Sequence, residues 1–401
     1  MRCIWTGVSG TLDTANPRYQ LVSAGPQYAW NTYENSTFGS QGRSVPITEN
    51  IIITKFTMWV GTAPGSGTWT FTVRKNAANT AASMTMTGAA TTATWSGQLS
   101  CSAGDLLCIA ATPTSSPTNA GTTYWTIEYT TQGNYYLVVS GNNGPSSGTG
   151  TYYYLPFGGN NIAVSTTATT NETLIPTNLT VTKISAIADQ TNGSGSFTYY
   201  VRNNTTATDS SFSAVINTSP FQAVSGAGSL SFSAGDAIVI KEVRSGTNWA
   251  NTRNCMTVVP SVTGEIVQAY SNTTAPSTSA TNYNTPLGGG SSAWNATESA
   301  VYMRMPASTL SKLYVKLATA PGASQSRTFT LRSNSADTTV AAMISGTATT
   351  GNDTVNSAVH VDGTFFSISS AVTGTPAATA GVKFGFVQTL QQSSSDFFPM
   401  F

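Results

Sequence analysis

The chain has 401 residues, of which 8% are charged and 39% are hydrophobic, and its formal net charge is +1. This balance, without a basic stripe, argues against a nucleic-acid partner, and no window holds the ~18–20 apolar residues of a membrane-spanning helix. The N-terminal residues also lack the apolar core and the cleavage site of a secretory signal. Neutral polar side chains must therefore keep the surface soluble, while the apolar residues suffice for packed cores.

One stretch occurs three times along the chain, at Ile51–Asn76, Leu179–Asn204 and Leu310–Asn334. Each copy predicts two strands joined by a short turn rich in Pro, Gly or Ser. A Lys near the start and an Arg near the end mark every copy, and the six residues are Lys55, Arg74, Lys183, Arg202, Lys312 and Arg332. The nearly constant offset predicts three tandem units of about 128 residues.

In chain order, the sequence predicts an N-terminal arm, three units and a short tail. The arm covers residues 1–37, and the units cover residues 38–157, 158–287 and 288–390. The tail, residues 391–401, is rich in aromatic residues. Short Pro/Gly pieces connect the units, which predicts that the units form a semi-rigid row.

Each unit contains about eight short segments of β-branched, aromatic or alternating residues, such as Ser83–Thr87 around Met84 and Met86. Period-two alternation predicts half-buried strands, and no stretch shows useful helical periodicity. The predicted fold class is therefore all-β, with three tandem β-sandwich domains. A jelly roll is favoured because its eight strands need more chain than the seven of an immunoglobulin-like sandwich, which is the alternative.

Few residues offer catalytic or metal-binding chemistry. The single histidine, His360, lies between two valines and is expected to face solvent on a half-buried strand. Asp105 and Asp236 occupy equivalent turns, where an aspartate usually bonds its own backbone. Cys101 and Cys108 flank the first of these turns, either as buried thiols or as a cross-strand disulfide. The repeated Lys and Arg are expected to make the same local contact to a carbonyl or carboxylate in each unit. We therefore predict no enzyme activity, no cofactor and no metal site.

Three features are candidates for binding or assembly. Loop aromatics at Tyr124-Trp125, Tyr152–Tyr154 and Trp249 are candidates for stacking on sugar rings. The aromatic tail is a candidate assembly segment, with residues Phe397, Phe398, Pro399, Met400 and Phe401. The sequons that would carry glycans in a secreted protein are Asn171, Asn178, Asn192, Asn203, Asn217, Asn272, Asn295 and Asn352.

The order of motifs in the units resembles that of β-sandwich repeats in hypothetical proteins of environmental tailed phages. In the first unit these motifs are Pro-Gly-x-Gly within Ala63–Gly67, the strand end Val73–Asn76, and Ala103–Asp105. The resemblance covers most of residues 45–390 and implies virion decoration or fibre material, with no catalytic residues to transfer. In the third unit Asp362-Gly363 stands where the others have Ala-Gly-Asp, so one turn departs from the pattern.

We therefore expect a structural protein of a phage-like virion, as a capsid decoration or a fibre component. Its expected partners are copies of itself and other virion subunits, which contact it through the sandwich units and the terminal tails. Two alternatives stay open: a subunit of a self-assembling, glycosylated extracellular fibre, and a glycan-binding module.

Overall fold

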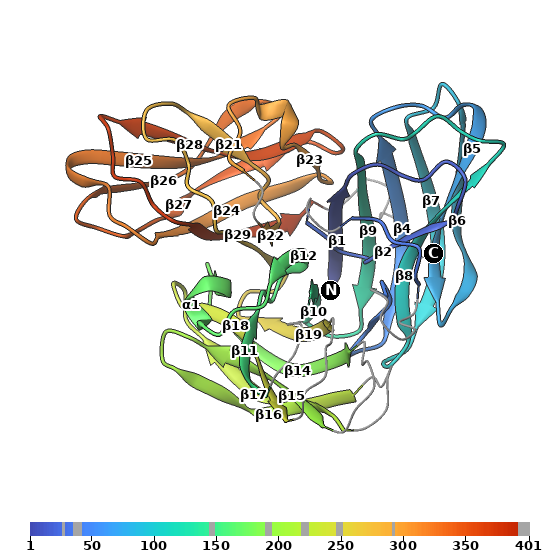
Figure 1. Ribbon diagram of the computed structural model, residues 1–401, viewed down its shortest axis with the longest axis horizontal. Helices are drawn as coiled ribbons and strands as arrows, with labels where there is room; N and C mark the ends of the chain where they lie inside the picture. Colours follow the sequence, from blue (N-terminus) through green and yellow to red (C-terminus); the bar gives the residue numbers. More distant parts are fainter. Residues whose placement is uncertain are drawn as a thin grey trace, which may run out of the picture.

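The computed structural model describes residues 1–25, 29–34, 42–143, 149–188, 195–217, 224–245, 252–290 and 293–391. Within these residues the helical elements are two single turns, α1 (Ala168–Asn171) and the 3₁₀ turn η1 (Glu298–Ala300). None of the described helices has the length and hydropathy needed to cross a membrane. The described strands form six sheets, which pair into three two-sheet sandwiches (Figure 1). The prediction of tandem β-sandwiches is confirmed.

The three sandwiches, called units 1, 2 and 3, follow one another along the chain. The strands of unit 1 are β1 (Arg2–Ser9), β2 (Arg18–Gln20), β3 (Val45–Pro46), β4 (Ile51–Val60), β5 (Gly65–Lys75), β6 (Ala78–Gly88), β7 (Thr92–Cys101), β8 (Leu106–Thr114) and β9 (Thr123–Thr131). Those of unit 2 are β10 (Tyr136–Asn143), β11 (Gly150–Tyr154), β12 (Gly158–Ala163), β13 (Thr173–Leu174), β14 (Leu179–Ala188), β15 (Ser196–Asn203), β16 (Thr208–Ile216), β17 (Val224–Phe232), β18 (Ala237–Ser245) and β19 (Thr252–Pro260). Those of unit 3 are β20 (Glu265–Asn272), β21 (Asn282–Asn284), β22 (Gly288–Gly290), β23 (Met303–Arg304), β24 (Ser308–Leu317), β25 (Gly322–Ser333), β26 (Ala336–Gly346), β27 (Thr350–His360), β28 (Phe365–Thr373) and β29 (Val382–Leu390).

Each unit has the topology of a jelly roll. In unit 1, one sheet has the order β1-β9-β4-β7, and the other has β8-β5-β6 with β2 and β3 following one another along β8. Units 2 and 3 repeat this order, with β12 and β22 added as parallel strands beside β10 and β20. The first and last strands of a unit pair, and most successive strands lie in opposite sheets, the exceptions being β2 and β3 and the hairpin of β5 and β6 with its equivalents, as in a double Greek key. The favoured jelly roll is therefore confirmed, and the immunoglobulin-like alternative is wrong.

The units begin earlier in the chain than the sequence predicted. β1 pairs with β9 inside unit 1, so residues 1–37 are not a separate arm. β10 and β11, assigned to the end of the first unit, are the first strands of unit 2. β20 and β21 likewise open unit 3. The boundaries at 157/158 and 287/288 are therefore wrong, and the units meet at the short connections 132–135 and 261–264.

The three units close a ring around a pseudo-threefold axis (Figure 1). β3 of unit 1 lies against β14 and β19 of unit 2, and β13 of unit 2 lies against β20, β24 and β29 of unit 3. β23 of unit 3 lies against β1 and β9 of unit 1, at the other end of the chain. Each unit thus contacts both others, and the expectation of a semi-rigid row is wrong.

The first strand of each unit lies near the centre of this ring. All eight residues of β20 are buried, as are seven of the eight in β1. Their sequences do not alternate between apolar and polar residues, because neighbouring elements cover both faces. In contrast, β15 alternates at every position, with Phe197, Tyr199 and Val201 buried, because only one of its faces packs on a core.

Candidate functional site

The Asp turns are fold elements, as predicted. Asp105 accepts a hydrogen bond from the backbone N–H of Ser102, and Asp236 accepts one from Ser233, each at 2.8 Å. In unit 3 Thr364 takes the place of the aspartate, and its hydroxyl donates to a backbone carbonyl of the same turn at 2.7 Å. The departure from Ala-Gly-Asp in unit 3 therefore keeps a side-chain bond within the turn.

The repeated lysines all pair with carboxylates, as predicted, but the expectation of the same local contact in each unit is wrong, because the three glutamates lie at different places in the fold. Each lies at a β-bulge in the middle of β4, β14 or β24. The ion pairs are Lys55–Glu128 at 3.3 Å, Lys183–Glu49 at 2.8 Å, and Lys312–Glu265. Since Lys183 belongs to unit 2 and Glu49 to unit 1, this pair also joins two units. A bulge re-aims the side chain it carries, which here brings Lys183 to the neighbouring unit.

The repeated arginines bind across the hairpin that follows each of them. Their side-chain partners there are Asn79 for Arg74, Asp209 for Arg202 and Asp337 for Arg332. Two of the arginines also bind a glutamate, Glu34 in unit 1 and Glu298 in unit 3. These local contacts confirm the structural reading of the repeated arginines.

His360 was expected to face solvent, and this expectation is wrong. Its side chain is fully buried, whereas Val359 and Val361 are each 61% exposed. Nδ1 lies 2.8 Å from the hydroxyl of Ser333, and the ring packs edge-on against Phe366. Burial lowers the pKa of His360 to about 4. The imidazole is therefore a neutral, packed group in the core of unit 3.

The four cysteines are buried free thiols, so the disulfide alternative for Cys101 and Cys108 is wrong. Burial raises the pKa of Cys101 to about 11 and that of Cys3 to about 12. Thiols of this kind stay protonated near neutral pH and are poor nucleophiles. Across the described ranges, no group of three or more His, Cys, Asp or Glu side chains could hold a metal ion.

Of the five described loop aromatics considered for sugar stacking, two belong to cores, and Tyr152 and Tyr153 are half-buried. Trp125 is fully buried, and its indole N–H donates to the carbonyl of Val22 at 2.9 Å. Tyr154 is also fully buried and donates to Glu242 Oε2 at 2.5 Å. Tyr124 is half-buried and lies at an interface between units. The candidate residues that lie outside the described residues are Trp249, Phe397, Phe398, Pro399, Met400 and Phe401.

The predicted sequons divide by burial. The exposed ones are Asn178, Asn217 and Asn352. The buried ones are Asn171, Asn203 and Asn272. Asn295 is half-buried, and Asn192 lies outside the described residues. A glycan cannot be attached to a buried amide in the folded chain, so any glycosylation is restricted to the accessible sequons.

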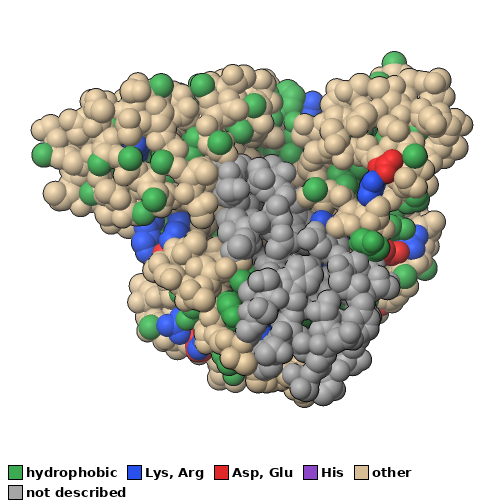
Figure 2. Space-filling view, in the orientation of Figure 1, with side chains coloured by type: hydrophobic (Ala, Val, Ile, Leu, Met, Phe, Trp, Pro, Cys, Tyr) green, Lys and Arg blue, Asp and Glu red, His purple; other side chains and the backbone are tan. Residues whose placement is uncertain are grey.

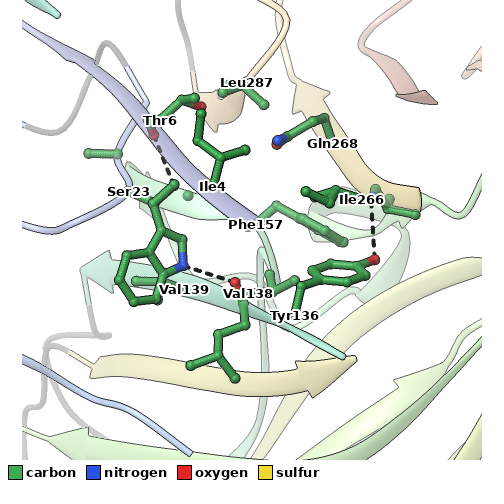
Figure 3. A pocket seen from close by; sticks show the side chains of 15 residues that line it. Ile4, Thr6, Ser23, Tyr136, Val138, Val139, Phe157, Ile266, Gln268 and Leu287 are labelled. Atoms are coloured by element: carbon green, nitrogen blue, oxygen red, sulfur yellow. Dashed lines mark hydrogen bonds between the residues drawn. The ribbon is translucent and has the colours of Figure 1, made fainter. Parts of the chain in front are cut away.

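The first strands of the three units meet at the pseudo-threefold axis (Figure 3). Trp5 of unit 1 donates from Nε1 to the carbonyl of Leu137 in unit 2 at 2.9 Å. Tyr136 of unit 2 accepts a hydrogen bond from the backbone N–H of Val267 in unit 3 at 3.2 Å. The cavity between these strands has a volume of about 30 Å³. That volume suits a water molecule rather than an organic ligand, so the axis is a packed joint.

The interfaces between units use equivalent positions with different chemistry. The first position is the residue before β3, β13 or β23. The second is the penultimate residue of β4, β14 or β24, and the third is the second residue of β9, β19 or β29. At the interface of units 1 and 2 they are Ser44, Ile187 and Arg253. At that of units 2 and 3 they are Glu172, Lys316 and Lys383, and at that of units 3 and 1 they are Tyr302, Trp59 and Tyr124.

Charged residues fill these positions between units 2 and 3. Glu172, only 1% exposed, pairs with Lys316 at 2.9 Å and with Lys383 at 3.0 Å. Burial alone would raise the pKa of Glu172, but the two ammonium groups and Asn204 hold it below its ordinary value. Burial also lowers the pKa of Lys383. A cleft of about 570 Å³ opens beside this cluster.

Aromatic residues fill the same positions between units 3 and 1. The guanidinium of Arg304 lies 5.8 Å from the ring of Trp59 and 4.3 Å from that of Phe365. Tyr302 stacks on Phe365 with ring centroids 4.2 Å apart. Burial raises the pKa of Tyr124, which lines a cleft of about 390 Å³ here together with Tyr302.

A buried arginine occupies the interface of units 1 and 2. Arg253 is 1% exposed and donates from Nη1 to the carbonyl of Gly42 at 2.8 Å. Sequence reasoning missed all three interface sets because it did not predict the ring. The sequence did contain one signal of these interfaces, which is that equivalent positions of the repeat hold chemically different residues. Lys316 and Trp59, for example, occupy the same position in two copies.

No protein-family model matches this sequence, and no curated protein does. Among solved structures, the chain is similar to the N-terminal CBM22-1-CBM22-2 tandem domain of Xyn10C from Paenibacillus barcinonensis. That match has 12% sequence identity and a TM-score of 0.15, and it covers 55% of this chain and 82% of the other. Similarity at this level assigns no ligand and no activity to the present chain.

Proposed function

We propose that the chain is a non-enzymatic structural protein of a phage-like virion, either a capsid decoration or a fibre component. The observation that carries this proposal is the closed ring of three jelly rolls within one chain. Jelly rolls recur in viral capsid proteins. A ring that repeats one fold about an axis suits a threefold position in a symmetric particle.

The roles of the chemically versatile residues support a structural function. His360 is a packed neutral group, and the cysteines are buried thiols with raised pKa values. The repeated lysines and arginines hold bulges, hairpins and one interface together. Each of these groups thus serves the fold or the ring.

The proposed partners are further copies of the chain and other virion subunits. Edge strands such as β6 and β7, which end the two sheets of unit 1, offer backbone groups for strand pairing. The C-terminal aromatic segment, which lies outside the described residues, offers apolar side chains for insertion into a neighbour.

Deletion of residues 393–401 tests the role of this segment. Light scattering of the concentrated full-length chain should show assemblies larger than one 41.7 kDa chain, and the deletion should shift them toward the single chain. Replacing Ser393–Ser395 by alanines keeps the aromatic residues and serves as the control. Assemblies of unchanged size after the deletion would contradict an assembly role for the tail.

Immuno-electron microscopy tests the virion itself. Tailed particles should be purified on a density gradient from the sample whose DNA encodes the chain. Antibodies raised against the recombinant chain should label these particles. Label confined to cell-surface filaments would overturn the virion proposal and favour the extracellular fibre. Intact-mass measurement of the native chain adds a second criterion, because added hexose mass at Asn178, Asn217 or Asn352 also favours the fibre.

A further inference from the structure

We propose that the cleft between units 2 and 3 binds a saccharide that carries a carboxylate group. The inference rests on the size and lining of the cleft, on its charge, and on a comparison with the equivalent cleft elsewhere in the same ring. It is independent of the proposed structural role. In the space-filling view, Lys or Arg side chains gather where the lobes of units 3 and 2 meet (Figure 2).

The size and lining of the cleft suit a sugar. Its volume of about 570 Å³ lies within the range of small-molecule sites and holds one or two sugar rings. Its accessible hydroxyl groups come from Thr169, Thr170, Thr273 and Thr349. Its apolar surface comes from Leu317, Ala318 and Ala380. A sugar presents both hydroxyl groups and C–H faces, so this mixed lining matches it on both counts.

The charge of the cleft suits one carboxylate. Lys316 and Lys383 bring two positive charges, and Glu172 compensates one of them. Lys383 donates to Glu172 and to the carbonyl of Thr169. The hydrogen bond from Lys316 to Glu172 uses one of its three donors, and its side chain is 37% exposed at the cleft. A ligand with a single negative charge would balance the excess and bind Lys316.

The equivalent interface shows that closing the ring does not require these charges. Between units 3 and 1, Tyr302, Trp59 and Tyr124 occupy the positions of Glu172, Lys316 and Lys383. A buried ion pair often adds no more stability than apolar residues of similar volume, because its desolvation is costly. Ring closure therefore does not explain the charged residues between units 2 and 3, whereas binding of a charged ligand explains them.

Other anionic ligands fit the cleft less well. Among the described residues that line the cleft, no arginine grips a phosphate by two parallel hydrogen bonds, and Glu172 would repel a doubly charged phosphate. The described part of the lining also offers no aromatic ring on which a nucleobase could stack. A carboxylated sugar, such as a uronic or sialic acid, needs neither group.

Saturation-transfer NMR on the full chain tests the proposal with glucuronic acid and N-acetylneuraminic acid at millimolar concentration. Glucose serves as the neutral comparison. We expect saturation transfer to at least one acid and a Kd for it at least tenfold lower than for glucose. No transfer to either acid, or equal affinity for glucose, would overturn the proposal.

Variants then locate the site. The triple variant Glu172→Tyr, Lys316→Trp and Lys383→Tyr introduces all three residues of the equivalent interface and leaves no buried carboxylate unpaired, and it should weaken acid binding at least tenfold while thermal unfolding shows that the fold persists. If that variant fails to fold, Lys316→Gln removes one charge at a partly exposed position and should weaken binding severalfold. Tyr302→Phe in the other cleft is the matched control and should leave binding unchanged. Acid binding that survives loss of Lys316, or that requires the Tyr302 hydroxyl, would contradict the assignment.

Discussion

Glu242 and Arg244 form a fully buried ion pair inside unit 2. Arg244 donates from Nε to Glu242 Oε1 at 2.9 Å, and its guanidinium lies 4.9 Å from the ring of Phe197. Burial raises the pKa of Glu242 although Arg244 opposes the shift. In unit 3 the same positions in the strand register hold Ser370 and Val372, so a charged pair at these positions is not required by the jelly roll.

The substitution Glu242→Leu should destabilise unit 2 by about 3–5 kcal/mol, because it leaves the charge of Arg244 buried without a carboxylate. The double variant Glu242→Ser and Arg244→Val introduces the residues of unit 3 and should lose less stability than the single one. Hydrogen-exchange mass spectrometry on peptides of β15 and β18 measures the difference. A double variant less stable than Glu242→Leu would contradict this account.

The buried His360 should make unit 3 sensitive to acid. The unfolded chain binds a proton below a pH of about 6.5, whereas the folded chain binds it only below a pH of about 4. Above pH 6.5 His360 adds no pH dependence to the free energy of unfolding. As the pH drops from 6.5 to 4, this free energy falls by up to about 3 kcal/mol, because the unfolded chain binds the proton first. Denaturant titrations at pH 4.5 and 7.5 measure this fall, and His360→Asn, which does not titrate, should reduce it. An equal fall in the variant would assign the acid sensitivity to other groups.

At the scale of elements, turns and bulges give each unit its local geometry. The Asp105 turn joins β7 to β8, and its carboxylate also accepts a hydrogen bond from Asn76 Nδ2 at 2.7 Å. It thereby links this turn to the hairpin that follows β5. The repeated lysines lie at bulges in β4, which lies between β7 and β9 in its sheet, and in the equivalent strands β14 and β24. These bulges direct the lysine side chains toward carboxylates.

Asp105→Ala should lower the stability of unit 1 by about 1–2 kcal/mol, because two donors lose their charged acceptor. Ser102→Ala is the matched control, since Ser102 contributes its backbone N–H and not its hydroxyl to the turn. The midpoint of thermal unfolding, followed by near-ultraviolet circular dichroism, distinguishes the two. Equal midpoints for both variants would show that the aspartate bonds add nothing measurable.

At the scale of the whole molecule, the contact between units 3 and 1 closes the ring. No short connection ties these units to each other, so side chains such as Trp59 and Arg304 must hold them together. Trp59 is 9% exposed in the closed ring, and its burial contributes to the interface through apolar area and the cation–π contact.

Trp59→Ala should open the ring between units 3 and 1 while each sandwich stays folded. The expected signs are a larger radius of gyration by small-angle X-ray scattering and faster hydrogen exchange in β23. Tyr33→Ala removes an aromatic residue that is 46% exposed in the same unit and serves as the control. A Trp59→Ala variant with an unchanged radius and unchanged exchange in β23 would mean that other contacts close the ring.

Much of each unit follows from local sequence. Alternating residues such as Met84 and Met86 specify strands because one side chain in two must be buried. Asp105 and Asp236 specify turns because a short carboxylate can reach its own backbone. The repeat specifies how many units there are. None of these signals depends on contacts between distant parts of the chain.

The phase of the repeat, the ring and the interface chemistry were decided by tertiary structure. A repeating sequence reveals its period but not where a unit starts, and here the start depends on the pairing of β1 with β9, more than 110 residues apart. Alternation around His360 likewise shows that neighbours face opposite ways, but packing against Phe366 decides which side is inside. The cluster of Glu172, Lys316 and Lys383 exists only because the ring brings two units together.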